Sequence, residues 1–83
     1  MNVRIKYFAS IREAAGSGSE TLATEATTLG QLRDALIARG GALGEALARG
    51  KSVRMALDQV MCDESQALPE GAEVAFFPPV TGG

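Results

Sequence analysis

The sequence of 83 residues contains no histidine, no tryptophan and a single cysteine, Cys62. Imidazole is the side chain that most often supplies acid–base catalysis near neutral pH, so its absence excludes that chemistry within one chain. A single cysteine cannot form an internal disulfide, and no set of cysteine and histidine ligands for a metal can be assembled. We therefore expect no metal site and a reduced thiol, as in cytoplasmic proteins.

Long apolar runs are also missing. No stretch approaches the ~20 residues that cross a bilayer, and the sequence does not open with the basic and apolar segments of a secretion signal. We therefore expect a cytoplasmic protein without a membrane span. Hydrophobic residues make up 46% of the chain, which is enough for one compact core but not for a second domain or a deep, enclosed active site.

Basic residues are absent from the last third of the chain. Residues 1–54 contain all 8 lysines and arginines and 5 acidic residues, which gives this part a net charge of +3. Residues 55–83 contain 5 acidic residues and no basic residue, which gives −5, and the two parts sum to the net charge of −2. An acidic segment disfavours nucleic-acid binding and suits docking on a basic partner surface. A solvated surface without a partner produces the same pattern.

Alternating apolar and polar residues predict strands over residues 2–8 and 19–25, and a last strand from Glu73 to Phe77. Residues 52–62 have the pattern of a hairpin that turns at Asp58-Gln59. We place Val3, Ile5 and Tyr7 of the first strand on its inner face, with Val60 and Cys62 of the hairpin and Val74 and Phe76 of the last strand.

Capping signals predict the helices. Ser10 can cap a short helical turn that Gly16 stops. Thr28 and Gln31 form a capping box that opens the main helix, which ends at Gly40-Gly41 and is followed by a second short helical segment. The order of elements favours an α+β β-grasp fold, in which a mixed sheet of four or five strands wraps one main helix. We assign this domain to residues 1–77 and an extended, flexible C-terminal tail to residues 78–83.

Three large apolar residues, Phe8, Met61 and Phe77, fall on the outer phase of their strands. If those strands are neighbours, the three side chains form one exposed apolar patch of the kind that marks an interface. Bulges that shift the phase, or short helices that cover the patch, would remove it.

The tail contains no charged side chain: Pro78, Pro79, Val80, Thr81, Gly82 and Gly83. Two prolines favour an extended conformation, and six residues reach ~19–20 Å. The final glycines can pass through a channel too narrow for other residues, and the one ionisable group at the tip is the carboxylate of Gly83. Activation of this carboxylate by ATP and displacement of AMP by sulfide or a persulfide would produce a thiocarboxylate. Nothing in the chain could catalyse these steps, so partner enzymes must supply the catalytic groups.

The segment from Glu73 to Gly83 resembles the C-terminus of the sulfur carrier subunits of molybdopterin synthase, the MoaD family. The segments Tyr7-Phe8-Ala9 with Ile11-Arg12-Glu13 and Leu68-Pro69-Glu70-Gly71 are also similar to that family, and residues 17–50 match only in pattern. The resemblance implies a ubiquitin-like β-grasp fold and a non-catalytic, sulfur-donating subunit in molybdenum cofactor biosynthesis.

The resemblance further implies that Gly83 is adenylated by an E1-like adenylyltransferase and receives sulfur from a donor such as a cysteine desulfurase or a rhodanese. The tail then enters the large synthase subunit, in a heterotetramer, and sulfur passes to cyclic pyranopterin monophosphate to form the dithiolene of molybdopterin. AMP and sulfur are thus carried only transiently on Gly83, with no bound cofactor. Phe8, Met61 and Phe77 match positions at which the family contacts the large subunit.

Asp58 stands where the family commonly has asparagine, which adds a negative charge near the expected interface. Three other functions remain open: a sulfur carrier of another pathway, such as the thiamine pathway; a ubiquitin-like modifier joined to lysines through Gly83; and a non-covalent binding module. A catalytic Cys62 is disfavoured because its segment is acidic and the chain has no histidine. Asp58, Asp63 and Glu64 lack the spacing of a calcium loop.

Overall fold

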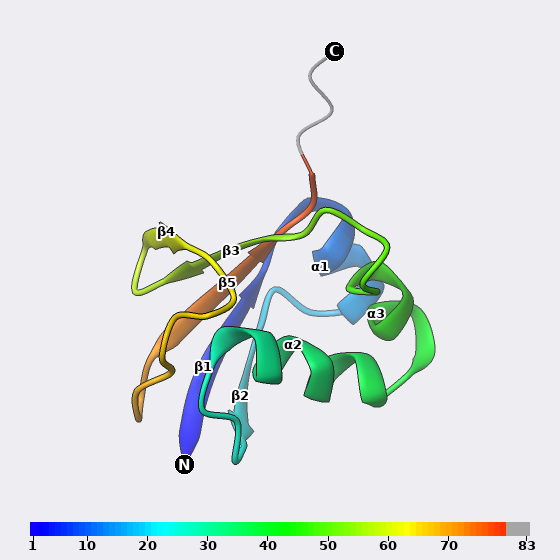
Figure 1. Ribbon diagram of the computed structural model, residues 1–83. Coiled ribbons are helices and arrows are strands. Elements are labelled where there is room, and N and C mark those ends of the chain that lie inside the picture. The colour runs from blue at the N-terminus through cyan, green and yellow to red at the C-terminus, as the bar shows by residue number, and fades with distance from the viewer. Residues whose placement is uncertain (80–83) are drawn as a thin grey trace.

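A computed structural model describes residues 1–79 of the chain (Figure 1). Five strands and three helices follow one another, each within a few residues of its predicted place: β1 (Asn2–Tyr7), α1 (Ala9–Ala15), β2 (Ser19–Ala23), α2 (Leu29–Ala38), α3 (Gly41–Ala46), β3 (Arg54–Leu57), β4 (Val60–Cys62) and β5 (Glu73–Phe77).

The strands form one sheet in the order β2-β1-β5-β3-β4. β1 and β5 pair in parallel at the centre of this sheet, and the other three pairs are antiparallel. Figure 1 shows the helices gathered on one side of the sheet, with α2 crossing below β1 and β5. A parallel pair needs a long crossover connection, and residues 8–72 provide it. This arrangement is the ubiquitin-like β-grasp that the sequence predicts.

The core lies between the inner face of the sheet and the helices. β1 and β5 face it with alternate residues, because side chains of a strand alternate between its two faces. Val3, Ile5 and Tyr7 of β1 are buried as predicted, and α2 adds its apolar stripe. The fully or almost fully buried large side chains are Tyr7, Phe76, Ile5, Ile11, Leu29, Leu32, Leu36, Leu47, Val3 and Val74.

The beginning of α1 differs from the prediction. Ser10 lies inside the helix rather than at its cap, and the N-cap position is Phe8, whose side chain makes no capping hydrogen bond. Phe8 holds this place because the strand ends only one residue earlier. The end of α1 is as predicted: Gly16 adopts a left-handed conformation with φ of 77°, and its N–H donates to the carbonyl of Arg12.

The capping box of α2 is present with one change. The hydroxyl of Thr28 accepts a hydrogen bond from the N–H of Gln31 at 3.1 Å. The side-chain oxygen of Gln31 accepts from the N–H of Thr27 at 2.8 Å, one residue before the expected donor. Gly40, with φ of 75°, is the N-cap of α3, and Gly41 is the first residue of that helix. The glycine pair therefore separates two helices.

The hairpin turns at Asp58 and Gln59, as predicted. Both residues have positive φ, 47° and 72°, which is the conformation that two-residue hairpin turns of type I′ require. The Asp58 carboxylate also accepts the N–H of Glu73 at 3.0 Å, which ties the turn to β5. Val60 pairs with Leu57 and therefore lies on the inner phase of the hairpin, as predicted, but its side chain is 68% exposed. β4 is a short edge strand, so its first residue extends beyond the helices that cover the core.

Candidate functional site

The root of the tail lies at the end of β5. Pro78 is half-buried and Pro79 exposed, and both line a cleft of about 290 Å³ together with residues of α1, α3 and Lys51. Neither proline has an N–H to donate, so β5 ends at Phe77 as predicted. In Figure 1 the chain leaves the sheet at the end where α1 begins. The other predicted tail residues, Val80, Thr81, Gly82 and Gly83, lie outside the described residues.

An aromatic stack stands beside this root. Tyr7 of β1 is paired with Phe76 of β5 in parallel register, so the next residues, Phe8 and Phe77, are also neighbours. Their rings stack with centroids 4.6 Å apart and planes 11° apart. Phe8 is 40% exposed and Phe77 half-buried. Two of the three predicted interface residues thus form one contact.

The third predicted residue, Met61, lies farther along the same outer face. It is 54% exposed and pairs with Ala56 of β3, which pairs in turn with Ala75 of β5. Both alanines are nearly buried although they point outward, because larger neighbours cover them. The two small residues Ala56 and Ala75 therefore lie between Met61 and the aromatic stack on the outer face.

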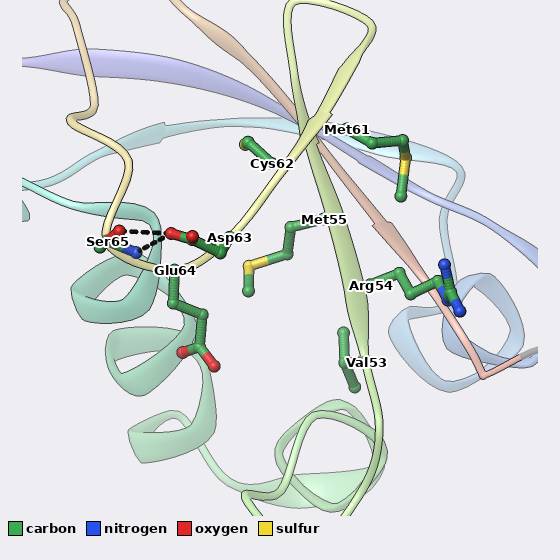
Figure 2. Close-up of a pocket in the computed structure, with 8 residues that line it drawn as sticks. All are labelled: Val53, Arg54, Met55, Met61, Cys62, Asp63, Glu64 and Ser65. Carbon is green, nitrogen blue, oxygen red and sulfur yellow. Dashed lines mark hydrogen bonds between the residues drawn. The ribbon is translucent and has the colours of Figure 1, made fainter.

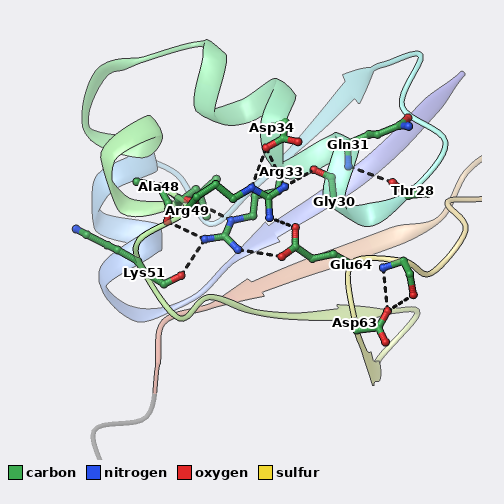
Figure 3. A network of polar contacts seen from close by, with 12 residues as sticks. Thr28, Gly30, Gln31, Arg33, Asp34, Ala48, Arg49, Lys51, Asp63 and Glu64 are labelled. Carbon is green, nitrogen blue, oxygen red and sulfur yellow. Dashed lines mark hydrogen bonds and ion pairs between the residues drawn. The ribbon is translucent and has the colours of Figure 1, made fainter.

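A buried arginine holds the segment that leads into β3. The side chain of Arg33, on α2, is only 4% exposed and donates three hydrogen bonds to the carbonyl oxygens of Leu47, Ala48 and Lys51, at 2.7, 2.8 and 2.9 Å (Figure 3). It also pairs with the Glu64 carboxylate at 3.3 Å. Arginine suits this place because its planar fork carries five donors, which several acceptors can share.

The same carboxylate joins a second arginine. Arg49 donates to Glu64 and contacts the Asp34 carboxylate through two nitrogens, at 2.9 and 2.8 Å. Sequence reasoning did not identify this network. A usable signal was present, since Arg33 interrupts the apolar stripe of α2 between Leu32 and Leu36, and a charged residue facing the core needs partners there.

A cleft of about 740 Å³ opens where β3 and β4 diverge (Figure 2). It is lined by Val53, Arg54, Met55, Met61, Cys62, Asp63, Glu64 and Ser65. Cys62 is half-buried rather than fully buried, and burial raises the pKa of its thiol, which opposes formation of a nucleophilic thiolate. Asp63 is engaged with the N–H and hydroxyl of Ser65. The cleft thus contains no activated nucleophile.

No group of three or more potential metal ligands occurs among the described residues. Across residues 1–79, no helix has both the length and the apolar character needed to cross a membrane.

Comparison with known proteins identifies the family. Residues 5–83 match the model of the ThiS family. The chain is 36% identical to the molybdopterin synthase sulfur carrier subunit of Escherichia coli over 81 residues, which covers 98% of this chain and 99% of that protein.

Two solved structures share the fold. Small archaeal modifier protein 1 of H. volcanii is 26% identical, covers 95% of this chain and 98% of its own, and has a TM-score of 0.78. In the complex of subunits 1 and 2 of the molybdopterin-converting factor from Helicobacter pylori, the matched chain is 26% identical, with full coverage of both chains and a TM-score of 0.68. The chain therefore belongs to the ThiS family, the same family as the molybdopterin synthase sulfur carrier subunits that it matches from end to end.

Proposed function

We propose that this chain is the sulfur carrier of a molybdopterin synthase and that Gly83 is the residue that carries the sulfur. The observation that carries the proposal is the exposed Phe8–Phe77 stack at the root of an uncharged tail, on a chain that matches such carriers over its whole length. The stack fixes the body against a partner, and the six residues that follow reach ~19–20 Å into it.

The first step activates the carboxylate. A Gly83 oxygen attacks the α-phosphorus of ATP on an E1-like adenylyltransferase, pyrophosphate leaves, and an acyl-adenylate forms. The terminal persulfide sulfur of a donor such as a cysteine desulfurase or a rhodanese then attacks the acyl carbon, and AMP leaves. A thiol must reduce the resulting acyl disulfide to release the thiocarboxylate, whereas free sulfide would give the thiocarboxylate directly.

The second stage transfers the sulfur. The tail enters the large synthase subunit, as part of a heterotetramer. The thiocarboxylate sulfur attacks a carbon of cyclic pyranopterin monophosphate and displaces the oxygen substituent of that carbon, which leaves with the electron pair of the broken C–O bond. Water cleaves the acyl–sulfur bond and regenerates the Gly83 carboxylate. Each dithiolene requires two thiocarboxylates, because each carrier delivers one sulfur atom.

The partners supply the catalytic groups in this scheme. The chain has no histidine, and the pKa of its one thiol is raised rather than lowered. Its own contribution is to present and orient the acyl group, so we infer that it is not an enzyme by itself. The need for ATP and a reduced sulfur source places the carrier in the cytoplasm.

The test is the intact mass of the protein after incubation with its activating enzyme, ATP and a sulfur donor. We expect the mass gain that corresponds to replacement of one oxygen by sulfur. A variant lacking Gly83, and a variant with one alanine added after Gly83, should show no gain and should unfold at the same temperature as the parent protein. A sulfur gain in the extended variant would contradict the proposal.

A second function is favoured by the similarity to small archaeal modifier protein 1. Attack of a lysine amine, instead of sulfur, on the same acyl-adenylate would join Gly83 to a target protein through an amide bond. A search for conjugates in cells separates this modifier function from the carrier. Addition of the large subunit and its pterin precursor separates molybdopterin formation from a thiamine-type pathway, in which no molybdopterin forms.

A further inference from the structure

Only two of the five acidic side chains in residues 55–79, Glu64 and Glu73, form ion pairs, and the other three accept hydrogen bonds from uncharged groups. Each of the five acidic side chains in residues 55–79 has a partner in the structure: Asp58 with the N–H of Glu73, Asp63 with Ser65, Glu64 with Arg33 and Arg49, Glu70 with the N–H of Asn2, and Glu73 with Arg4 and Lys6. Asp58 and Glu70 lie near the start of β5 and the start of β1, away from the Phe8–Phe77 stack at the other ends of these strands.

The cations are distributed differently. Arg54 pairs with Phe77 in the register of β3 and β5, so it stands beside the aromatic stack. Figure 2 shows Arg54 and Met61 extending to one side of β3 and Met55 to the other. Arg54 is exposed, and no carboxylate of residues 1–79 forms an ion pair with it. Asp63 and Glu64 line the same cleft, but both are engaged elsewhere.

Lys6 borders the outer face from the other direction. It pairs with Ala75 in the register of β1 and β5, and its side chain is 46% exposed. Its carboxylate partner is Glu73, at 3.5 Å, which Arg4 also contacts, at 3.4 Å. Arg4, Lys6 and Arg54 of the outer face thus outnumber its carboxylate Glu73, which pairs with the first two and leaves Arg54, beside the apolar centre, without an ion pair to residues 1–79.

We propose that Arg54 and Lys6 recognise carboxylates of the protein that covers the Phe8–Phe77 stack, and that this partner surface is apolar at its centre and acidic where it meets the two cations. The proposal rests on the proposed function, in which a partner covers this face. Docking would remove water from Arg54, and an arginine that loses water without gaining an anion is costly. A partner whose surface opposite Arg54 is neutral or basic therefore binds with lower affinity.

Carboxylates of a protein fit better here than phosphates of a nucleotide. Arg54 lies level with Phe77, and six residues, which can span at most ~19–20 Å, separate that level from the carboxylate of Gly83 that the proposed function makes reactive. A nucleotide that reacts with Gly83 at the end of an extended tail is too far away for the guanidinium of Arg54. Arg54 and Lys6 instead contact the surface of the partner protein around the opening through which the tail enters it.

The experiment measures association of the full chain with the large synthase subunit of the same organism at several salt concentrations. The variants are Arg54→Gln and Lys6→Gln, and the control is Ala35→Glu, an exposed position on α2 that lowers the net charge by the same one unit. We expect the two variants to lower the association rate constant by about two- to tenfold at low salt, with the difference vanishing at high salt. The control should associate like the parent chain.

Equal association rates for the variants, the control and the parent chain would overturn the proposal, and so would tighter binding of Arg54→Gln, since that would mean a basic partner. Variants that bind normally but need more ATP for adenylation would assign the cations to the nucleotide instead, which also overturns it. The proposed function is judged separately by the mass gain on Gly83. A missing gain with charge-dependent binding would refute sulfur carriage and leave the acidic partner in place.

Discussion

The ring of Phe8 stacks on the ring of Phe77, with centroids 4.6 Å apart, although the two residues come from the beginning and the end of the chain. The parallel pairing of β1 and β5 brings them together. Since Phe77 is the last residue before Pro78 and Pro79, the most exposed aromatic surface among residues 1–79 lies at the root of the segment to which the proposed function assigns sulfur transfer. A partner that binds the stack therefore also fixes the starting point of the tail.

Replacement of Phe77 by alanine should impair binding more than folding. Phe77 is only half-buried, so we expect a loss of about 1–2 kcal/mol in the free energy of unfolding, part of it from the aromatic pair. Binding to the large synthase subunit should weaken by more than about tenfold, as for aromatic residues at the centre of an interface. Denaturant unfolding and calorimetric titration measure the two effects.

The matched control is Val60→Ala, because Val60 is a large apolar residue that is 68% exposed at the edge of the sheet. Its replacement should change neither quantity by more than about 0.5 kcal/mol. If Phe77→Ala lowered the free energy of unfolding as much as it weakened the free energy of binding, the ring would stabilise the fold and would not be an interface residue.

Arg33→Met should destabilise the fold strongly. The substitution keeps most of the apolar stem but leaves the carbonyls of Leu47, Ala48 and Lys51 without their donor. Buried acceptors that lose a partner cost roughly 1–3 kcal/mol each when water cannot replace it, so we expect a total loss of about 2–4 kcal/mol in the free energy of unfolding. Arg49→Met should cost at most about 1 kcal/mol, because its ion pairs are exposed. Similar losses in urea unfolding for both variants would refute the structural role of Arg33.

Tyr7 should make the stability of the protein fall in alkaline solution. Burial, together with the 2.7 Å hydrogen bond that its hydroxyl donates to Glu20, raises the pKa of this tyrosine. Above about pH 10 the unfolded chain loses the phenol proton while the folded chain keeps it, so stability declines with rising pH, by up to ~1.4 kcal/mol per pH unit. Below that pH the contribution is fully present.

Urea unfolding from about pH 8 to about pH 11 measures this decline, and the matched Tyr7→Phe variant should lack it. The chain has one tyrosine, so the absorbance of tyrosinate follows the same group directly in the folded protein. An equal decline in both proteins would mean that other groups cause it.

Cys62 should react slowly with thiol reagents in the folded protein. Burial raises its pKa, which lowers the fraction of thiolate, and the thiolate is the reactive form. We expect labelling near pH 8 to be much slower than in the urea-unfolded chain, and to be absent in Cys62→Ser. Labelling at equal rates in the folded and unfolded chains would contradict this, and would reopen the possibility of a reactive thiol.

Much of the fold could be predicted from local patterns. β5 was predicted with its observed bounds because two prolines follow it, and the hairpin turn because Asp58 and Gln59 tolerate positive φ. Helix starts were less certain, since several neighbouring residues can cap. Ser10 is a good cap by type, but the end of β1 one residue before Phe8 leaves that role to Phe8. The exposure of Val60 depends on where the sheet ends, which no local pattern encodes.

The sequence by itself determined the apolar phases of the strands, the uncharged side chains of the tail and the absence of histidine, because each is a property of residue type and spacing along the chain. Only the tertiary structure decided that Phe8 and Phe77 touch, that Arg33 is buried among carbonyl oxygens, and that Glu64 and Glu73 form ion pairs with arginines and a lysine of the first part of the chain. These features depend on which strands are neighbours and on distances between residues remote in the chain. Charge counted along a sequence therefore does not predict which acids and bases lie close enough to form ion pairs.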